Sequence, residues 1–184
     1  MIVFFSGLNG SYWNTTKTAY AGNGTAGNST AQLSSPFGLA FDVNNSLYVG
    51  DAGNRRVIKF PFNNNTGTIV ASKIAPSPQG LYELGTDDMY VYLDASQNLY
   101  VSDCGNHRVL RYANGNATGS IVAGNETAGA ELNQLNCPLG IWVDSSSNLF
   151  IADLRNHCVM KWAQNATTGI LVAGVTGAAG MNIN

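Results

Sequence analysis

The sequence predicts an all-β fold made of three repeated units, and three observations support this. One phrase occurs three times, as LYVGDAGNRRVIKF at 47–60, LYVSDCGNHRVLRY at 99–112 and LFIADLRNHCVMKW at 149–162. The aspartates in this phrase are spaced by 52 and then 50 residues. The repeated segments are short and rich in β-branched and aromatic residues, which favour strands. A period of about 50 residues with strand-like content is typical of a repeat architecture.

Each unit contains four short apolar segments, which we interpret as antiparallel strands. The first strand is LAFDV at 39–43 in unit 1 and IWVD at 141–144 in unit 3. The two halves of the repeated phrase form the second and third strands. The fourth strand follows a Thr-Gly turn, as TIVA at 68–71 and ILVAG at 170–174. Four short antiparallel strands per unit, stacked face to face, form the blade of a β-propeller.

The segment before unit 1 aligns without a gap to the segment before unit 3, as AGNGTAGNSTAQLSSP and AGNETAGAELNQLNCP. Residues 17–22 therefore take the place of the fourth strand of an earlier blade. We divide the chain into an N-terminal segment at 1–16 and a partial propeller at 17–184, with blades at about 36–72, 88–124 and 138–174. An incomplete ring exposes two blade faces, so we expect self-association through these faces or further blades in a longer chain.

The unit resembles the NHL repeat, and the resemblance covers roughly residues 17 to 177. It rests on Pro-x-Gly at 36–38 and 138–140, on an Asp pair, and on Asp-x-x-Asn-x-Arg-Val. The matching residues are Asp42, Asp51, Asn54 and Arg56, then Asp94, Asp103, Asn106 and Arg108, then Asp144, Asp153 and Asn156. The resemblance implies a β-propeller, usually a closed ring of about six blades, of which this chain is half. Unit 2 has Asp88-Met89-Tyr90 in place of Pro-x-Gly, and unit 3 has Cys158 in place of the Arg.

We interpret the repeated polar residues as scaffold. The Asp that ends the second strand is expected to accept backbone N–H bonds from the turn that follows. The Arg is expected to reach an Asp or a carbonyl of the neighbouring blade. On this interpretation none of these residues is catalytic, and no cofactor is expected.

Composition argues against a nucleic-acid partner. Charged residues are 11% of the chain, the formal net charge is −2, and Lys plus Arg total nine without a basic run. A phosphate-binding surface needs clustered basic side chains, so we expect a protein or a small ligand as partner. No stretch is long and apolar enough for a transmembrane helix.

Nine Asn-x-Ser/Thr sequons favour a glycosylated extracellular protein. The candidate glycosylation sites are Asn14, Asn23, Asn28, Asn64, Asn116, Asn125 and Asn165. The alternative is turn chemistry, because three of these residues fall in the same turn before the fourth strand. The apolar start of the chain is too short for a signal peptide.

The three cysteines leave two pairings open. Cys137 could pair with Cys158 in its own blade or with Cys104 across the blade seam, and one thiol is then left over. Three buried, unbonded cysteines are the alternative.

Candidate catalytic and metal-binding groups are few. His107 and His157 hold equivalent places in adjacent units but lack a third ligand, and Glu83, Asp87 and Asp88 match no calcium-binding loop. No nucleophile motif is present.

We therefore predict a non-catalytic binding or scaffold module. Its expected contact surface is the set of turns between second and third strands, with Ala52, Gly53, Cys104, Gly105, Leu154 and Arg155. The alternatives are a fragment of a propeller enzyme, of amidating-lyase or lactonase type with its catalytic residues in missing blades, and an intracellular NHL interaction module.

Overall fold

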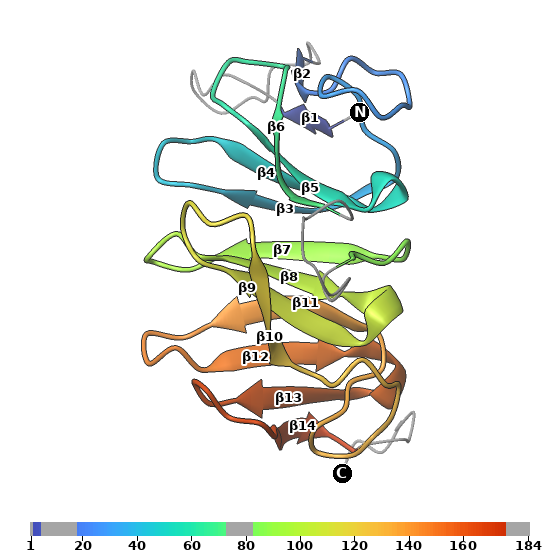
Figure 1. The fold of residues 1–184 in the computed structure, drawn as a ribbon, viewed down its shortest axis with the longest axis vertical. Coiled ribbons are helices and arrows are strands. Elements are labelled where there is room, and N and C mark those ends of the chain that lie inside the picture. The colour runs from blue at the N-terminus through green and yellow to red at the C-terminus, as the bar shows by residue number, and fades with distance from the viewer. Residues whose placement is uncertain (1, 5–17, 73–82, 176–184) are drawn as a thin grey trace, which may run out of the picture.

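The computed structural model describes residues 2–4, 18–72 and 83–175 and confirms the all-β prediction (Figure 1). Three four-stranded antiparallel sheets, which we call blades 1 to 3, each follow the order of the chain. Blade 1 contains β3 (Pro36–Phe41), β4 (Leu47–Asp51), β5 (Arg56–Phe60) and β6 (Thr68–Ser72). Blade 2 contains β7 (Met89–Leu93), β8 (Leu99–Asp103), β9 (Arg108–Tyr112) and β10 (Gly119–Ala123). Blade 3 contains β11 (Pro138–Val143), β12 (Leu149–Asp153), β13 (Cys158–Trp162) and β14 (Ile170–Gly174).

The first strand of blades 1 and 3 starts and ends earlier than predicted. In blade 1 it runs from Pro36 to Phe41 rather than over 39–43, so Pro-x-Gly lies inside the strand. Proline is tolerated there because the first residue of a strand need not donate to the ladder. The strand stops before Asp42 because Asp42 Oδ1 accepts the backbone N–H groups of Asn44 and Ser46, at 2.9 and 2.8 Å, and closes a turn.

Two further strands precede blade 1. β2 (Thr18–Ala21) lies where the sequence predicted a leading strand at 17–22. β1 (Ile2–Phe4) pairs with it in antiparallel fashion. β1 lies in the N-terminal segment, for which no strand was predicted.

Short 3₁₀ helices join the second and third strands of each blade, at places where the sequence predicted turns. They are η1 (Ala52–Asn54), η2 (Cys104–Asn106) and η3 (Leu154–Asn156). Each is followed by a residue in the left-handed conformation, namely Arg55, His107 or His157. None of the helices in the described part of the chain is long and apolar enough to cross a membrane.

The antiparallel strand order gives the stack two distinct ends. The end that carries η1 to η3 and the linkers between blades, at 22–35 and 124–137, is called the linker face. The opposite end carries the turns between first and second strands and between third and fourth strands, and is called the turn face. In Figure 1 the 3₁₀ helices lie at the right edge of the stack and the turns at the left edge.

Three buried apolar clusters fill the seams between successive layers, and all follow one template. Each contains an alanine from a fourth strand, a leucine from the linker and an aromatic residue from the third strand of the following blade. The sets are Ala21, Leu33 and Phe60; Ala71, Leu84 and Tyr112; and Ala123, Leu135 and Trp162. β2 thus occupies the place of the fourth strand of an earlier blade.

The two outer faces of the stack remain open among the described residues. Gly38 of β3 is covered by β7 of blade 2. At the equivalent position in β11, a Cβ atom added to Gly140 would have only Ala152 within 4 Å. Beside Gly140, Trp142 is 54% exposed. On the other side of the stack, Leu39 is 43% exposed although the cluster of Ala21, Leu33 and Phe60 covers part of the same face of blade 1. Blade faces of this kind are covered inside the stack, so these are the surfaces where a further blade or a second copy would pack.

Alanine substitution at these two equivalent glycines tests the seam geometry. In Gly38→Ala the new Cβ would lie 2.6 Å from Tyr90 Cα and 2.8 Å from the Met89 carbonyl oxygen, so the seam must open. We expect a loss of about 1–3 kcal/mol in the free energy of unfolding, measured by urea denaturation. The matched control Gly140→Ala should change it by less than about 0.5 kcal/mol. Equal losses in the two variants would contradict this packing.

Candidate functional site

The repeat signature forms a buried hydrogen-bonded cluster at the linker face of blade 1. Asp51 Oδ1 accepts the backbone N–H of Ser34 at 2.6 Å, and Oδ2 accepts bonds from Asn54 Nδ2 at 2.8 Å and Arg56 Nε at 2.7 Å. The remaining Arg56 nitrogens donate to three linker carbonyls, those of Asn28, Ser29 and Gln32. We call such a set an Asp cluster.

This geometry corrects two sequence-based expectations. The backbone N–H donor to Asp51 comes from the linker before the blade, not from the turn after it. Arg56 binds the Asp of its own blade and linker carbonyls, not a neighbouring blade. All of these contacts hold the linker against the blade, so the signature side chains have a structural role.

Blade 2 repeats the Asp cluster with one addition. Asp103 accepts bonds from Gly85 N at 2.9 Å, Asn106 Nδ2 at 2.9 Å and Arg108 Nε at 3.1 Å. Arg108 also forms an ion pair with Glu126, which lies in the linker to blade 3. The guanidinium therefore ties blade 2 to the linker that follows it.

Blade 3 keeps the carboxylate but has no arginine. Asp153 is buried and accepts bonds from Asn136 N and Asn156 Nδ2, each at 2.7 Å. Burial raises the pKa of Asp153, against the opposing effects of these two donors and of His107. Cys158 takes the place of the arginine as a buried free thiol, and burial followed by the charge of Asp153 raises its pKa.

The other repeated aspartates close turns on the turn face. Asp42 Oδ2 also forms an ion pair with Lys59 Nζ at 2.8 Å. Burial on its own would raise the pKa of Asp42, but hydrogen bonds from Lys59 and Ser46 outweigh it and lower the pKa. In the equivalent residues Asp94 and Asp144, one carboxylate oxygen accepts a backbone N–H and the other accepts a hydrogen bond from an Asn side chain. The Asn148 side chain, ahead of burial, lowers the pKa of Asp144.

The predicted contact loops are only partly accessible. Ala52 and Cys104 are buried, so they cannot form a recognition surface, and that expectation was wrong for both. Gly53 lies against Ser34, and Gly105 against Gly85 and Asp87, because the linker packs over η1 and η2. Leu154 and Arg155 in η3 are exposed. In blades 1 and 2, the residues found in η1 and η2 therefore reflect packing against the linker.

The candidate glycosylation asparagines in the described part of the chain are exposed; Asn14 lies outside it. The exposed candidates are Asn23, Asn28, Asn64, Asn116, Asn125 and Asn165. Four of them also organise a turn, because Oδ1 accepts the backbone N–H of the residue two positions later. These four are Asn23, Asn64, Asn116 and Asn125. The sequon pattern thus has a structural role at these four sites whether or not glycans are attached.

A disulfide joins Cys104 of η2 to Cys137 before β11, across the seam between blades 2 and 3. This is one of the two pairings that the sequence left open. His107 Nδ1 accepts the N–H of Cys137 at 3.2 Å. Within the described ranges, no three His, Cys, Asp or Glu side chains gather as a metal site, and neither the two histidines nor Glu83, Asp87 and Asp88 form one.

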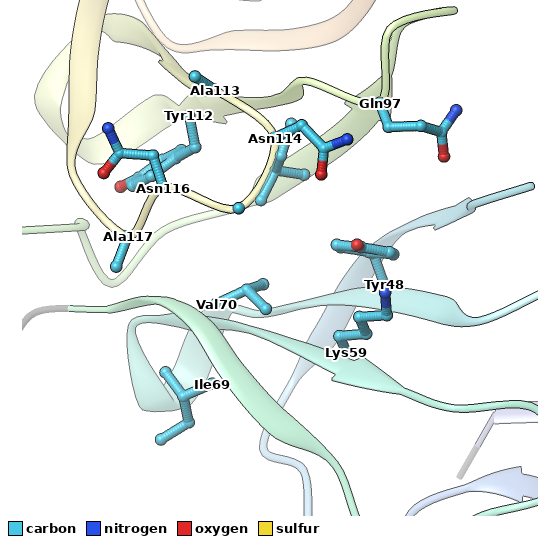
Figure 2. Close-up of a pocket in the computed structure, with 12 residues that line it drawn as sticks. Tyr48, Lys59, Ile69, Val70, Gln97, Tyr112, Ala113, Asn114, Asn116 and Ala117 are labelled. Atoms are coloured by element: carbon cyan, nitrogen blue, oxygen red, sulfur yellow. The ribbon is translucent and has the colours of Figure 1, made fainter. Parts of the chain in front are cut away.

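A groove of about 310 Å³ opens at the turn face between blades 1 and 2 (Figure 2). Blade 1 contributes Tyr48, Lys59, Ile69 and Val70 to one wall. Blade 2 contributes Gln97, Leu99, Tyr112 and the turn at 113–117 to the other wall, and Figure 2 shows Asn114 and Gln97 above Tyr48 and Lys59. Burial raises the pKa of Tyr112 to about 12, so this phenol is neutral.

The equivalent groove between blades 2 and 3 is larger, at about 720 Å³. It repeats the same positions, with Tyr100 and Arg111 on blade 2 facing the turn at 163–167 of blade 3. Each blade carries such a cross-strand pair of an aromatic residue and a cation. The pairs are Tyr48 with Lys59, Tyr100 with Arg111, and Phe150 with Lys161. Lys59 and Lys161 lie 5.1 and 5.4 Å from the ring centres of their partners.

Sequence reasoning missed these grooves. Their residues belong to no motif, and two adjacent blades build each groove. One signal was available: the second strand has an aromatic residue at its second position and the third strand has Lys or Arg at its fourth position in every unit. On antiparallel neighbours these positions face each other, which would have placed a polar pair beside each seam.

Comparison with solved structures shows the fold. The chain is similar to a streptogramin B lyase (TM-score 0.55, 15% identity, 79% of this chain and 42% of that one). It is also similar to a gluconolactonase from Xanthomonas campestris (TM-score 0.55, 17% identity, 78% and 49%) and to a chain of a nidogen/laminin complex (TM-score 0.55, 17% identity, 74% and 47%). No family model and no curated protein matches the chain.

These similarities identify the three sheets as blades of a β-propeller. The chain spans less than half the length of each of these three structures. It therefore supplies an incomplete ring.

Restoring the missing cation in blade 3 tests the Asp cluster. In Cys158→Arg the guanidinium would reach Asp153, so we expect the free energy of unfolding at pH 7 to rise by about 1–3 kcal/mol relative to Cys158→Ala. The direction of the pH dependence of stability follows from the pKa of Asp153. With its pKa raised in the folded state, Asp153 gives its stabilisation below the unfolded pKa near 3.8 and loses it as pH rises through the folded pKa.

With the arginine present, the pKa of Asp153 should fall, and the advantage of Cys158→Arg should grow from pH 3 to pH 7. Urea unfolding of both variants between pH 3 and pH 7 measures this difference in the free energy of unfolding. An arginine variant less stable than Cys158→Ala at pH 7 would show that the site lacks room for the ion pair.

Proposed function

We propose that this chain is part of an NHL-type propeller that acts as a non-catalytic recognition module and binds its ligand in the grooves of the turn face. The observation that carries the proposal is the repeated groove. Two adjacent seams present the same arrangement, with an aromatic–cation pair on one wall and a polar turn on the other. Concave sites with a few convergent polar groups on an apolar base are typical of ligand pockets.

The turn face is favoured over the linker face because it carries open grooves, although Gln97 and Asn116 there also make hydrogen bonds within the protein. On the linker face, the carboxylates of Asp51, Asp103 and Asp153 are buried and hydrogen-bonded to linker and turn groups. On the turn face, Gln97, Asn114 and Asn116 line an open groove. Loops on a rigid β scaffold are where binding residues concentrate.

An extracellular location is supported by two features. The sequon asparagines within the described residues are exposed, and a disulfide crosses the seam between blades 2 and 3. Disulfides persist in oxidising compartments and are rare in the cytosol. An intracellular interaction module would keep Cys104 and Cys137 reduced.

A propeller enzyme is the second candidate. It is favoured by the similarity to a streptogramin B lyase and a gluconolactonase, which is a similarity of fold. In that case the catalytic groups would come from blades outside these residues. A longer polypeptide that turns over a lactone or a cyclic ester would support the enzyme.

Ligand-observed NMR with a panel of monosaccharides, amino acids and dipeptides tests the groove as a binding site. We expect ligand signals to broaden with the wild-type chain and to recover in Tyr48→Ala or Tyr100→Ala, because each removes one groove wall. Arg155→Ala, an exposed change on the linker face, is the control and should bind normally. Panel members that bind all of these variants equally well would argue against the grooves.

Expression in a secretory eukaryotic host tests the compartment. We expect the mass to fall after enzymatic removal of N-glycans, and to fall in steps in Asn23→Gln and Asn125→Gln, two exposed sites that line neither groove. Peptide mapping should find Cys104 linked to Cys137, with Cys158 alkylated only after unfolding. Reducing this bond, which closes a loop of 33 residues, should cost about 4 kcal/mol of stability. A secreted protein without glycans and with three free thiols would favour the intracellular module.

A further inference from the structure

The two grooves share one template but differ in the state of their cation. In the groove between blades 1 and 2, Lys59 Nζ is paired with Asp42 Oδ2 at 2.8 Å. In the groove between blades 2 and 3, the equivalent cation is Arg111, and among the described residues no carboxylate lies within ion-pair distance of it. The larger groove therefore holds a cation without a carboxylate partner.

One residue exchange explains this difference. In blade 1 the equivalent turn residue is Ser46. Its backbone N–H binds Asp42 Oδ1 and its side chain also hydrogen-bonds Asp42, while Oδ2 pairs with Lys59. In blade 2 the equivalent residue is Asn98. Its backbone N–H binds Asp94 Oδ1 and its Nδ2 binds Asp94 Oδ2, both at 2.8 Å. Both oxygens of Asp94 thus bind Asn98 in the turn, and the carboxylate also hydrogen-bonds the Tyr100 side chain.

Arg111 remains in the groove beside Tyr100. The guanidinium is half-buried and hydrogen-bonds the Tyr100 side chain. Burial first, and then the charge of Asp94, raises the pKa of Tyr100, so this phenol stays neutral at physiological pH. A guanidinium offers several donors in a planar fork that matches carboxylate and sulfate oxygens.

The rest of the groove consists of neutral polar and apolar groups. Hydroxyl and amide side chains come from Ser96, Ser120, Ser147, Gln164, Asn165 and Thr167. Leu149 and Ile121 add apolar surface, and Asp94 is the one acidic side chain among the described lining residues. Such a lining suits a compact ligand with several hydroxyl groups, and a volume of about 720 Å³ is ample for one or two sugar rings.

We propose that the groove between blades 2 and 3 binds an acidic sugar, a hydroxylated ring that carries a carboxylate or sulfate, with Arg111 as the anion-binding residue. This inference rests on the proposed function and names the ligand class of one of its two grooves. The anion takes the place that Asp42 occupies beside Lys59. The hydroxyl groups bind the serine and amide side chains of the walls.

Calorimetric titration of the full chain, freed of N-glycans because Asn165 lines the groove, tests the proposal. The probes are glucuronate and its neutral counterpart glucose. We expect glucuronate to bind at least about tenfold more tightly, because hydrogen bonds to charged groups are the stronger ones. In Arg111→Gln this preference should disappear, and Lys59→Gln, the matched change in the smaller groove, should retain it.

A second variant alters the site without touching the arginine. Asn98→Ser copies the blade 1 arrangement and frees Asp94 to pair with Arg111. We expect glucuronate affinity to fall by roughly tenfold, as the internal carboxylate competes for the guanidinium. A glucuronate-terminated disaccharide, compared with free glucuronate, separates a glycan end from a free sugar as the source of the anion.

The outcomes separate this inference from the proposed function. Equal affinity for glucose and glucuronate, with both lost in Tyr100→Ala, would overturn the anion preference and keep the groove as a binding site. Glucuronate binding that Arg111→Gln and Asn98→Ser leave unchanged would place the anion elsewhere and overturn the inference. No binding of either sugar, with groove-dependent binding of amino acids or dipeptides, would reject the acidic sugar alone.

Discussion

The buried carboxylate at the end of each second strand is the interaction on which the rest of the structure depends. Asp51, Asp103 and Asp153 each accept one backbone N–H from the linker before the blade and one Asn side chain from the following 3₁₀ helix. Removing such an acceptor would leave several buried hydrogen-bond donors without a partner. The same linkers carry the leucines that fill the seams, so each carboxylate also fixes how one blade packs on the next.

This use of the polar residues determines where recognition can occur. The linker face is occupied by its own hydrogen bonds, and in blades 1 and 2 the linker covers the small residues of the 3₁₀ helices. Among the described residues, no linker covers the grooves of the turn face. There Ser46 and Asn98 bind the aspartate of their turns differently, and Lys59 is ion-paired with Asp42 whereas Arg111 has no carboxylate within ion-pair distance among the described residues. The scaffold can stay fixed while the grooves differ.

Blade 3 shows how the repeat tolerates loss of one element. Asp153 has no arginine, yet it keeps both of its other hydrogen bonds, and a disulfide ties the start of blade 3 to η2 of blade 2. A covalent link across a seam restricts the unfolded chain and stabilises a blade whose outer face is open. Among the described residues, Trp142 on the outer face of blade 3 is exposed.

The sequence by itself determined the repeat and the four strands of each blade. It could do so because strand periodicity and turn chemistry are local, and three copies reinforce each pattern. It misjudged Ala52 and Cys104, since their burial depends on distant linkers: Ala52 packs in the cluster that contains Leu84, and Cys104 is bonded to Cys137. Only the tertiary structure paired Cys104 with Cys137 and created the grooves, because their walls belong to different blades and face each other only after the seams close.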